Sequence, residues 1–328
     1  MEYKILGRTD LKISRMGFGC WAIGGHGYGA VDDNVSMKAV RRALERGINF
    51  FDTADVYGFG HSEEVLGEAL GADKNSVVIA TKFGVNWDKN GSTYIDCSPK
   101  RIQESIDGSL KRLKIDCIPL YQVHWYDWVT PIPDILEALE KCRDAGKIRH
   151  IGFSNFPLDL ILGLPKKYRV ESVQSLYNVI TNGPEADFEK YAKTLGIGII
   201  VYGVLSRGLF TGKYNPGSRF GKNDTRDKDE NFKAANFLKN LQLVDYLREV
   251  GAYYGRKPAH VAIRWVLENG NVTSALVGMK TPEQVDENLK AFEFRMSVKD
   301  RNSISRFVER MKSKNLEEGE LDDYSSVL

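Results

Sequence analysis

The sequence predicts a single closed (β/α)8 barrel of the TIM type, and three observations point to this fold class. Eight short apolar runs alternate with longer segments of helical period along the 328 residues, which is the pattern of parallel β-α units. No change in composition divides the chain, and α/β barrels often run to about 250 residues as one domain. Eight such units favour a closed barrel over an open sheet, so we predict one domain over residues 1–328.

The predicted strands are rich in Val, Ile and aromatic residues. They are Arg15–Gly19, Ile48–Asp52, Ser76–Thr81, Cys117–Val123, Ile148–Gly152, Glu171–Ser175, Gly198–Val201 and Thr273–Val277. Segments of helical period lie between them. Val35–Arg46 repeats apolar residues along one face. Pro99–Leu113 follows Ser98, an N-cap residue before a proline at the first helical position, and Ile135–Ala145 ends at Gly146.

Two parts of the chain depart from this alternation. Tyr3–Leu6 and Leu11–Ile13 flank a short turn, which predicts an N-terminal β-hairpin that plugs the N-terminal end of the barrel. Lys213–Ala235 is long, polar and contains glycine. It predicts a lid loop with no core of its own, because loops of this length usually act as lids or are disordered. The acidic tail 316–328 is expected to fray.

The composition excludes several classes of protein. The net charge is +2, with Lys and Arg scattered among Asp and Glu, so no basic patch for nucleic acid is expected. No apolar run approaches the ~18 residues of a membrane helix, and the N-terminus lacks the apolar stretch of a signal peptide. The four cysteines have no C-x-x-C spacing, which favours free thiols in the cytoplasm. The histidines have no metal-ligand spacing, so no metal site is predicted.

Four titratable residues stand where predicted strands end. In such a barrel, functional side chains gather at the ends of strands, where the βα loops begin. Asp52 ends the second strand and Tyr57 comes five residues later, whereas Lys82 and His124 directly follow the third and fourth strands. A lysine behind an apolar run is costly to bury without a partner, and Asp52 is the expected one. We therefore predict that these four side chains cluster.

The four residue types suit the reduction of a carbonyl group, which needs a hydride from a cofactor and a proton from the protein. Tyrosine is protonated at neutral pH but is a weak acid, and a nearby ammonium lowers its pKa by stabilising the phenolate. Tyr57 is the expected proton donor, with Lys82 as the ammonium and Asp52 as its anchor. His124 would orient and polarise the carbonyl oxygen. Taken singly, each residue also has a structural interpretation, so the prediction depends on their joint spacing.

A second motif points to a different fold. Residues 17–22, GFGCWA, match the G-x-G-x-x-A fingerprint of dinucleotide-binding domains, which requires a helix to open on the motif. The glycine-rich residues 23–29 that follow are unsuited to a helix start. A doubly wound Rossmann dehydrogenase is therefore the weaker interpretation. The segment is predicted to be a flexible βα loop over the reactive ring of the cofactor, with Trp21 as a wall.

These residues and their surroundings resemble the aldo-keto reductase family, over almost the whole length of the chain. The Asp-Tyr-Lys-His tetrad of that family corresponds to the four residues above. The segments YKILGRTDLKISRMGFGCW, INFFDTADVYGFGHSEEVLGEAL, GKIRHIGFSNF and IIVYGVLSRGLFTGKY are similar to its landmarks. The segments GLFTGKY and VGMKTPEQVDENL resemble its prokaryotic and potassium-channel β-subunit branches.

The resemblance implies a nicotinamide cofactor and a set of residues that bind it. Ser154 and Asn155, completed by Gln174, would bind the carboxamide, and Tyr202 would stack on the nicotinamide ring. The remaining implied contacts follow the pyrophosphate and then the adenosine with its 2′-phosphate: Gly203, Leu205, Arg207 and Gly208, then Gly278, Lys280, Thr281, Gln284, Glu287 and Asn288. Two alternatives stay open, because Gln174 could be a polar plug in the barrel, and Gln284, Glu287 and Asn288 could be an exposed helix face. Gly203 and Met279 depart from the residues common in the family.

The function that the resemblance implies is NADP(H)-dependent reduction of an aldehyde or ketone, with a sugar-type carbonyl left open. Trp21, Trp87, Trp125 and Tyr126, together with Trp128, could form an aromatic wall for this small-molecule substrate. The alternative is a regulatory subunit that binds the cofactor and serves a partner, as in potassium-channel β subunits. Turnover, as opposed to cofactor binding alone, distinguishes the two. The sequence does not indicate an oligomeric state.

Overall fold

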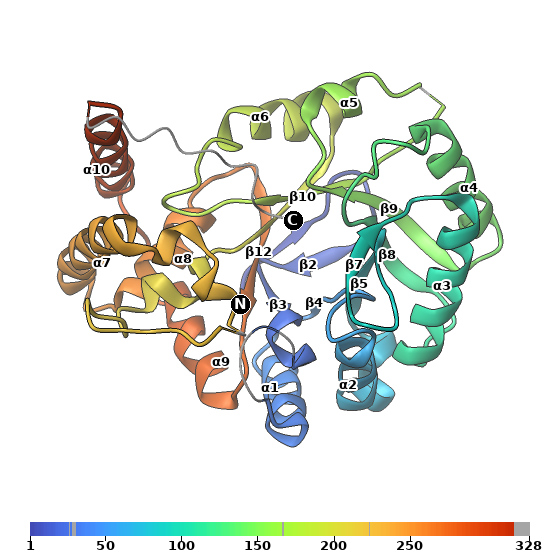
Figure 1. Cartoon of the computed structure of the whole chain (residues 1–328), viewed down its shortest axis with the longest axis horizontal. Helices are drawn as coiled ribbons and strands as arrows, with labels where there is room; N and C mark the ends of the chain where they lie inside the picture. Colours follow the sequence, from blue (N-terminus) through green and yellow to red (C-terminus); the bar gives the residue numbers. More distant parts are fainter. Residues whose placement is uncertain (26, 28–30, 166, 223, 318–328) are drawn as a thin grey trace.

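Eight parallel strands close into a barrel in the computed structural model, which describes residues 1–25, 27, 31–165, 167–222 and 224–317 (Figure 1). Only the backbone is described for residues 314–317. Every predicted barrel strand is confirmed, and their order around the barrel follows the sequence. The strands are β3 (Met16–Gly19), β4 (Phe50–Asp52), β5 (Val78–Phe83), β8 (Ile118–Val123), β9 (Ile148–Ser154), β10 (Ser172–Leu176), β11 (Gly198–Tyr202) and β12 (Val272–Gly278). The closed barrel excludes the doubly wound fold, and residues 21–24 form only a short 3-10 turn.

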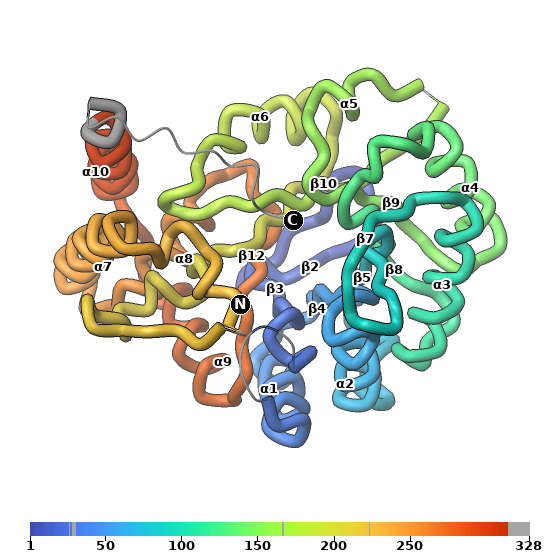
Figure 2. The backbone as a smooth tube through the Cα atoms, in the orientation of Figure 1, coloured from blue at the N-terminus to red at the C-terminus, as the bar shows by residue number. Residues whose placement is uncertain are grey.

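Helices surround the barrel, and the chain follows it round from the N-terminus to the C-terminal helix (Figure 2). They are α1 (Asp33–Glu45), α2 (His61–Leu70), α3 (Pro99–Leu113), α4 (Ile132–Asp144), α5 (Leu158–Leu162), α6 (Glu185–Glu189), α7 (Ala234–Tyr254), α8 (Pro258–Leu267), α9 (Pro282–Leu289) and α10 (Val298–Glu317). The Ser98 side chain accepts a hydrogen bond from the Arg101 amide and caps α3, as predicted. Within the described residues, no helix combines the length and apolarity that crossing a bilayer requires.

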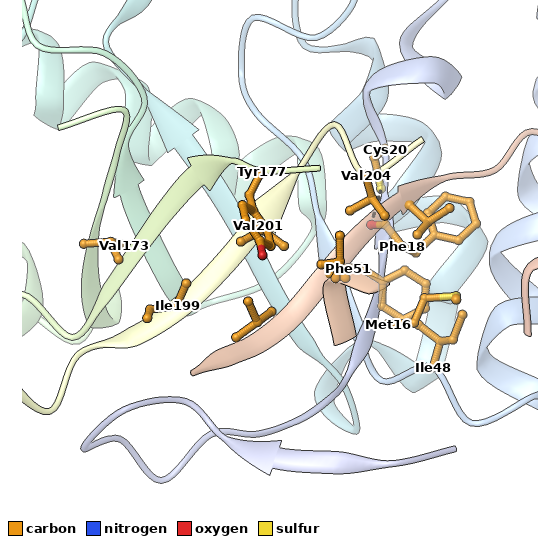
Figure 3. Close-up of a cluster of buried hydrophobic side chains, with 14 of the residues drawn as sticks. Met16, Phe18, Cys20, Ile48, Phe51, Val173, Tyr177, Ile199, Val201 and Val204 are labelled. Atoms are coloured by element: carbon orange, nitrogen blue, oxygen red, sulfur yellow. Dashed lines mark hydrogen bonds between the residues drawn. The ribbon is translucent and has the colours of Figure 1, made fainter. Parts of the chain in front are cut away.

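The N-terminal hairpin closes the bottom of the barrel. Strands β1 (Tyr3–Ile5) and β2 (Lys12–Ser14) pair antiparallel. Leu6, Leu11 and Ile13 are buried and pack against side chains that point into the barrel, namely Phe50, Ala80, Leu120, Ile200 and Leu276. The predicted plug is confirmed. The alternate side chains of the strands face the surrounding helices, and Figure 3 draws part of that outer core, which includes Phe18, Phe51 and Val201.

The structure of residues 213–235 differs in one respect from the lid loop without a core that the sequence predicts. Tyr214, Phe220 and Phe232 form a ring cluster with Phe237 of α7, with the centroids of Phe220 and Phe232 5.0 Å apart. The expectation that this segment has no core was therefore wrong, because its few aromatic residues pack together. The Thr225 amide also donates to the Gly27 carbonyl at 2.9 Å, which joins the segment to the β3–α1 loop. Its role as a lid stays a prediction, which hydrogen exchange with and without NADPH can test.

A second hairpin, which was not predicted from the sequence, follows β5. Strands β6 (Val85–Trp87) and β7 (Thr93–Ile95) pair antiparallel in the connection between β5 and α3, with Asn90-Gly91 in the turn. An Asn-Gly pair between alternating residues is a strong hairpin signal, so this element was predictable. The cysteines are free thiols, as expected. Residues 318–328 of the predicted acidic tail lie outside the described residues.

Candidate active site

The centre of the site is a buried ion pair at the upper end of the barrel. Asp52 is the last residue of β4, and Lys82 lies inside β5 rather than after it, because that strand continues to Phe83. The Lys82 Nζ donates to Asp52 Oδ1 at 2.5 Å and to the Thr53 carbonyl at 2.8 Å. Lys82 is fully buried and Asp52 almost so. The predicted pairing is confirmed, and it offsets the cost of burying both charges.

Two glutamines complete the surroundings of Asp52. Asp52 Oδ2 accepts hydrogen bonds from Gln174 Nε2 at 2.8 Å and from Gln122 Nε2 at 3.2 Å. Gln122, on β8, was not among the predicted site residues. The signal for it was the alternation of β8, because Gln122 is a polar residue at an inward position of a strand that is otherwise apolar. Gln174 therefore acts in part as the polar plug that the sequence left open.

Tyr57 lies above this ion pair in a turn that β5 and α2 hold in place. The Asp55 amide donates to the Lys82 carbonyl at 3.2 Å, and the Ser62 amide donates to the Tyr57 carbonyl at 3.1 Å. Lys82 Nζ lies 3.5 Å from the Tyr57 hydroxyl and 5.1 Å from the centre of its ring. The phenol therefore stands next to a buried ammonium, as the spacing in the sequence predicts.

His124 follows β8, and its ring meets the edge of Tyr57 with centroids 5.7 Å apart. Its Nδ1 atom is buried and has no hydrogen-bond partner among the described residues. Burial and the positive charge of Lys82 hold the pKa of His124 well below its usual value. The imidazole is therefore neutral at physiological pH and can donate an uncharged N–H to a polar ligand.

The predicted carboxamide-binding residues form one connected group beside His124. Asn155 adopts a left-handed backbone with φ of 60° directly after β9, a conformation that asparagine tolerates better than most residues. Its Nδ2 donates to the His124 carbonyl and to Ser154 Oγ, both at 3.1 Å. The Tyr202 hydroxyl donates to Asn155 Oδ1 at 2.9 Å. These contacts orient Asn155, Ser154 and Tyr202 at the ends of β9 and β11, which lie on either side of β10.

The loop after β11 bends sharply toward the β3–α1 loop. Gly203, Ser206, Arg207 and Gly208 all have positive φ, whereas Leu205 keeps a negative φ. Arg207 pairs with Asp229 at 2.5 Å, and its guanidinium lies 5.7 Å from the centre of the Trp21 ring. Trp21 in turn stacks on Tyr57 at 6.0 Å. The loop predicted to follow the pyrophosphate therefore reaches the residues around the phenol.

The residues after β12 surround the start of α9. Gly278 ends the strand, and the Thr281 side chain caps the helix by accepting from the Gln284 amide. Gln284 Oε1 accepts from the Lys280 amide at 2.7 Å. Glu287 contacts Lys257 and Lys290 and its pKa is lowered to about 2 by these two hydrogen-bonded ammonium groups, although partial burial acts against them. Gln284 is exposed and Asn288 is buried, so the predicted set does not form one exposed face.

Two further cations, Arg226 and Lys213, lie beside Lys280. Partial burial, followed by the charges of Arg226 and Lys213, lowers the pKa of Lys280, and only Asp224 acts in the opposite sense. Arg226 is held by Asp224 and by the Tyr214 hydroxyl. A group of three cations next to a capped helix N-terminus suits a phosphate. The residues present therefore fit the phosphate groups of a nicotinamide dinucleotide.

The predicted aromatic wall is divided among separate contacts. Trp21 stacks on Tyr57, whereas Trp87 meets Phe59 with ring centroids 5.6 Å apart. Tyr126 packs against Trp128 at 5.1 Å, and its hydroxyl donates to the Thr130 carbonyl at 2.9 Å. Trp125 is half-buried, and its carbonyl accepts from the Cys97 thiol.

The closed barrel and this tetrad define the class of protein. The family model described as "Aldo/keto reductase family" matches residues 15–309. The chain belongs to this family and is an oxidoreductase of the kind that uses a nicotinamide cofactor.

Particular relatives differ in cofactor. The chain is 34% identical over 293 residues to the Schizosaccharomyces pombe aldo-keto reductase yakc, whose name specifies NADP(+); the match covers 87% of this chain and 85% of yakc. It is 32% identical over 325 residues to the NADH-specific methylglyoxal reductase of Escherichia coli, covering 93% and 98% of the two chains. Among solved structures, a glycerol dehydrogenase from Gluconobacter oxydans matches with a TM-score of 0.87 and 34% identity over 99% of both chains.

Proposed function

We propose that the protein reduces an aldehyde or ketone to the alcohol with NADPH, and that Tyr57 donates the proton. One observation carries this proposal: the Tyr57 hydroxyl stands 3.5 Å from the ammonium of Lys82, which Asp52 holds at 2.5 Å inside the barrel. An ammonium in this position stabilises the phenolate that remains after the proton has left. When bound, the nicotinamide supplies the hydride.

The other residues of the site orient the carbonyl and protect the proton. His124 is neutral, so it can donate a hydrogen bond to the carbonyl oxygen without competing with Tyr57 as the acid. Gln122 and Gln174 saturate Asp52 Oδ2, which keeps the carboxylate facing Lys82. Asn155 and Ser154, oriented by Tyr202, are proposed to bind the carboxamide of the cofactor.

Replacing Tyr57 with Phe tests the proton donor. We expect Tyr57→Phe to fold and to bind NADPH, because Phe keeps the ring that stacks on Trp21. Its kcat should fall by ~10²–10⁴-fold, the usual contribution of general acid catalysis. NADPH absorbance gives the rate, and single-turnover measurements check that chemistry limits it. A variant that keeps more than about a third of the wild-type rate would remove Tyr57 from this role, since it falls far short of the loss expected of a general acid.

The cofactor is proposed to be NADPH, with Lys280 as a main contact of the 2′-phosphate. Lys280 lies with Arg226 and Lys213 beside the N-terminus of α9, where a dianion would meet three cations. The relatives do not decide this point, because one is named for NADP(+) and another is NADH-specific.

Binding of both cofactors to Lys280→Ala tests the assignment. Loss of one charged hydrogen bond of ~1.5–3 kcal/mol should weaken NADPH by roughly 10–100-fold. NADH, which lacks the phosphate, should bind almost as before. An equal loss for both cofactors would mean that Lys280 only supports the fold. A wild-type preference for NADH would contradict the proposed cofactor.

The proposed substrate is a small polar carbonyl compound. The relatives named for methylglyoxal and glycerol act on small polar molecules. A screen that follows NADPH absorbance over aldehydes, ketones and keto-sugars, with glycerol in the oxidative direction, tests this. Binding of NADPH with no turnover of any of these compounds would favour the regulatory-subunit alternative.

A further inference from the structure

A second group of buried charges lies outside the barrel, directly behind the site. Asp55 follows β4 in the turn that leads to Tyr57, and it is fully buried. Charged groups face it from two helices: Glu63 from α2, and Arg101 and Arg112 from α3. Tyr121 of β8, whose hydroxyl is buried and has no hydrogen-bond partner among the described residues, completes the surroundings. The proposed reaction uses none of these groups.

The two carboxylates of this group are held very differently. Glu63 accepts from Arg112 Nε at 2.7 Å and from the Thr81 hydroxyl at 2.6 Å. Neither oxygen of Asp55 has a hydrogen bond of good geometry within the described part of the chain. The nearest cation is Arg101, whose Nη2 lies 3.8 Å from Asp55 Oδ2. Asp55 and Arg101 therefore face each other about 1 Å beyond the length of a charge-assisted hydrogen bond, which is ~2.8 Å.

Arg101 is also held loosely, although its side chain is partly exposed to solvent. Its Nε is buried and has no partner among the described residues, and its Nη1 lies 3.8 Å from Glu104, which faces solvent. The guanidinium also lies 5.9 Å from the centre of the Trp87 ring, within the range of a cation–π contact. Arg101 thus lies between the buried carboxyl of Asp55 and Trp87 of the predicted aromatic wall, and neither contact holds it tightly.

The charge of Asp55 is poised to change near physiological pH. Burial first, and then the neighbouring Glu63, raise the pKa of Asp55 to about 8, although Arg101, Arg112 and the Val56 amide act against this. Below that pH the carboxyl is neutral and attracts Arg101 weakly. Above it the carboxylate attracts the guanidinium strongly, because Asp55 itself is fully buried.

We propose that Asp55 and Arg101 are positioning residues for Trp87 of the predicted aromatic wall. The charge on Asp55 sets how closely Arg101 approaches it, and thereby the position of the Trp87 ring. When the carboxyl loses its proton, the 3.8 Å gap closes to a hydrogen bond and the guanidinium leaves the face of Trp87. Trp87 then shifts against Phe59, which it contacts. Because Trp87 belongs to the predicted aromatic wall, the affinity for substrate changes, whereas the proton donor Tyr57 is unaltered. The effect on substrate rests on the proposed function, whereas the movement of Trp87 does not.

Tryptophan fluorescence, measured without substrate or cofactor, tests the movement. The signal of Trp87 is the difference between each protein and the same protein carrying Trp87→Phe, recorded from pH 6.5 to 9.5. We expect a transition near pH 8 in the wild type and its loss in both Asp55→Asn and Arg101→Gln. A flat wild-type signal, or a transition that survives in either variant, overturns the proposal. If Asp55→Asn fails to fold, Arg101→Gln decides alone.

Two matched variants separate this pair from its neighbours. Glu104→Gln removes the carboxylate on the solvent side of Arg101, and its transition should match that of the wild type. Tyr57→Phe should also keep the transition, which excludes titration of the phenol as its source. Loss of the transition in either of these two variants contradicts the assignment to Asp55.

A kinetic measurement extends the test to the reaction, with methylglyoxal as the probe carbonyl. In the wild type we expect KM to change across pH 8, and in Asp55→Asn to stay level, while kcat follows the same profile in both. Parallel KM profiles would overturn the link to substrate. An absence of turnover in the wild type would count against the proposed function, and the fluorescence result would still decide the movement.

Discussion

Asp52 and Asp55 lie three residues apart, and both are buried, yet the protein surrounds them in opposite ways. Asp52 points into the barrel, where an ammonium and two amides contact it within 3.2 Å. Asp55 lies between the barrel and helices α2 and α3, and its nearest cation is 3.8 Å away. Burial alone therefore does not decide what a carboxyl group does, because hydrogen-bond partners determine whether its charge is stabilised.

The largest effect on this comparison is expected from Lys82→Met, which makes Asp52 resemble Asp55 by removing its cation. Breaking a buried ion pair from one side costs about 3–5 kcal/mol of unfolding free energy. The rate of carbonyl reduction should fall at least as far as in Tyr57→Phe, because the phenolate loses its neighbour. Denaturant unfolding and NADPH turnover measure the two losses.

A double variant is the control for this prediction. Adding Asp52→Asn to Lys82→Met removes the uncompensated carboxylate, so stability should partly return while activity stays lost. Restored activity in the double variant would show that Lys82 serves the fold alone.

The next effect concerns the pH dependence of stability. The pKa of Asp55 is raised in the folded protein, so between about pH 4 and pH 8 the folded state holds a proton that the unfolded chain has released. The contribution of Asp55 to stability is therefore complete at low pH and is lost as the pH rises, by at most ~1.4 kcal/mol per pH unit.

Asp55→Asn lacks this dependence. Its unfolding free energy, relative to that of the wild type, should therefore increase as the pH is raised from 5 to 8. Urea unfolding at four pH values measures the difference. Parallel curves would mean that Asp55 titrates as an ordinary carboxyl.

The smallest effect is expected from Gln122→Leu, which removes one amide from Asp52 and leaves the ion pair in place. A hydrogen bond to a charged group contributes roughly 1.5–3 kcal/mol, and the loss should be independent of pH over the neutral range. Gln174→Leu is the matched comparison, because it removes the second amide and also a proposed cofactor contact. NADPH affinity should fall in Gln174→Leu and change little in Gln122→Leu; equal losses would remove Gln174 from the cofactor site.

The sequence predicts the barrel well because the alternation of apolar runs and helical segments is repeated eight times. The tetrad could be predicted for a related reason: each member stands at or near a strand end, and closure of the barrel brings those ends together. Asp52 and Lys82 needed only the rule that a buried lysine requires a partner.

Other features depend on contacts between residues distant in the sequence. In the sequence, Gln122 is a single polar residue in an apolar strand. Its role becomes clear only in the structure, where it contacts Asp52, which is 70 residues away along the chain. The Asp55–Arg101 pair joins a turn to a helix that begins more than forty residues later, and no local pattern relates them. The packing of Tyr214, Phe220 and Phe232 was hidden by the polar residues around them. Composition averages over a segment, whereas a small core needs only a few aromatic side chains.

The plug formed by β1 and β2 closes the N-terminal end of the barrel among the described residues. Leu6, Leu11 and Ile13 pack on Phe50 and Leu120, so the described interior beneath Asp52 is filled with apolar side chains and offers water no passage there. Under the proposed function, each turnover consumes the proton of Tyr57, and its replacement has to arrive through the mouth that the alcohol product occupies. The alcohol product would then have to leave before Tyr57 is reprotonated. The closed N-terminal end of the barrel would in this way set the order of two steps that take place at the opposite end.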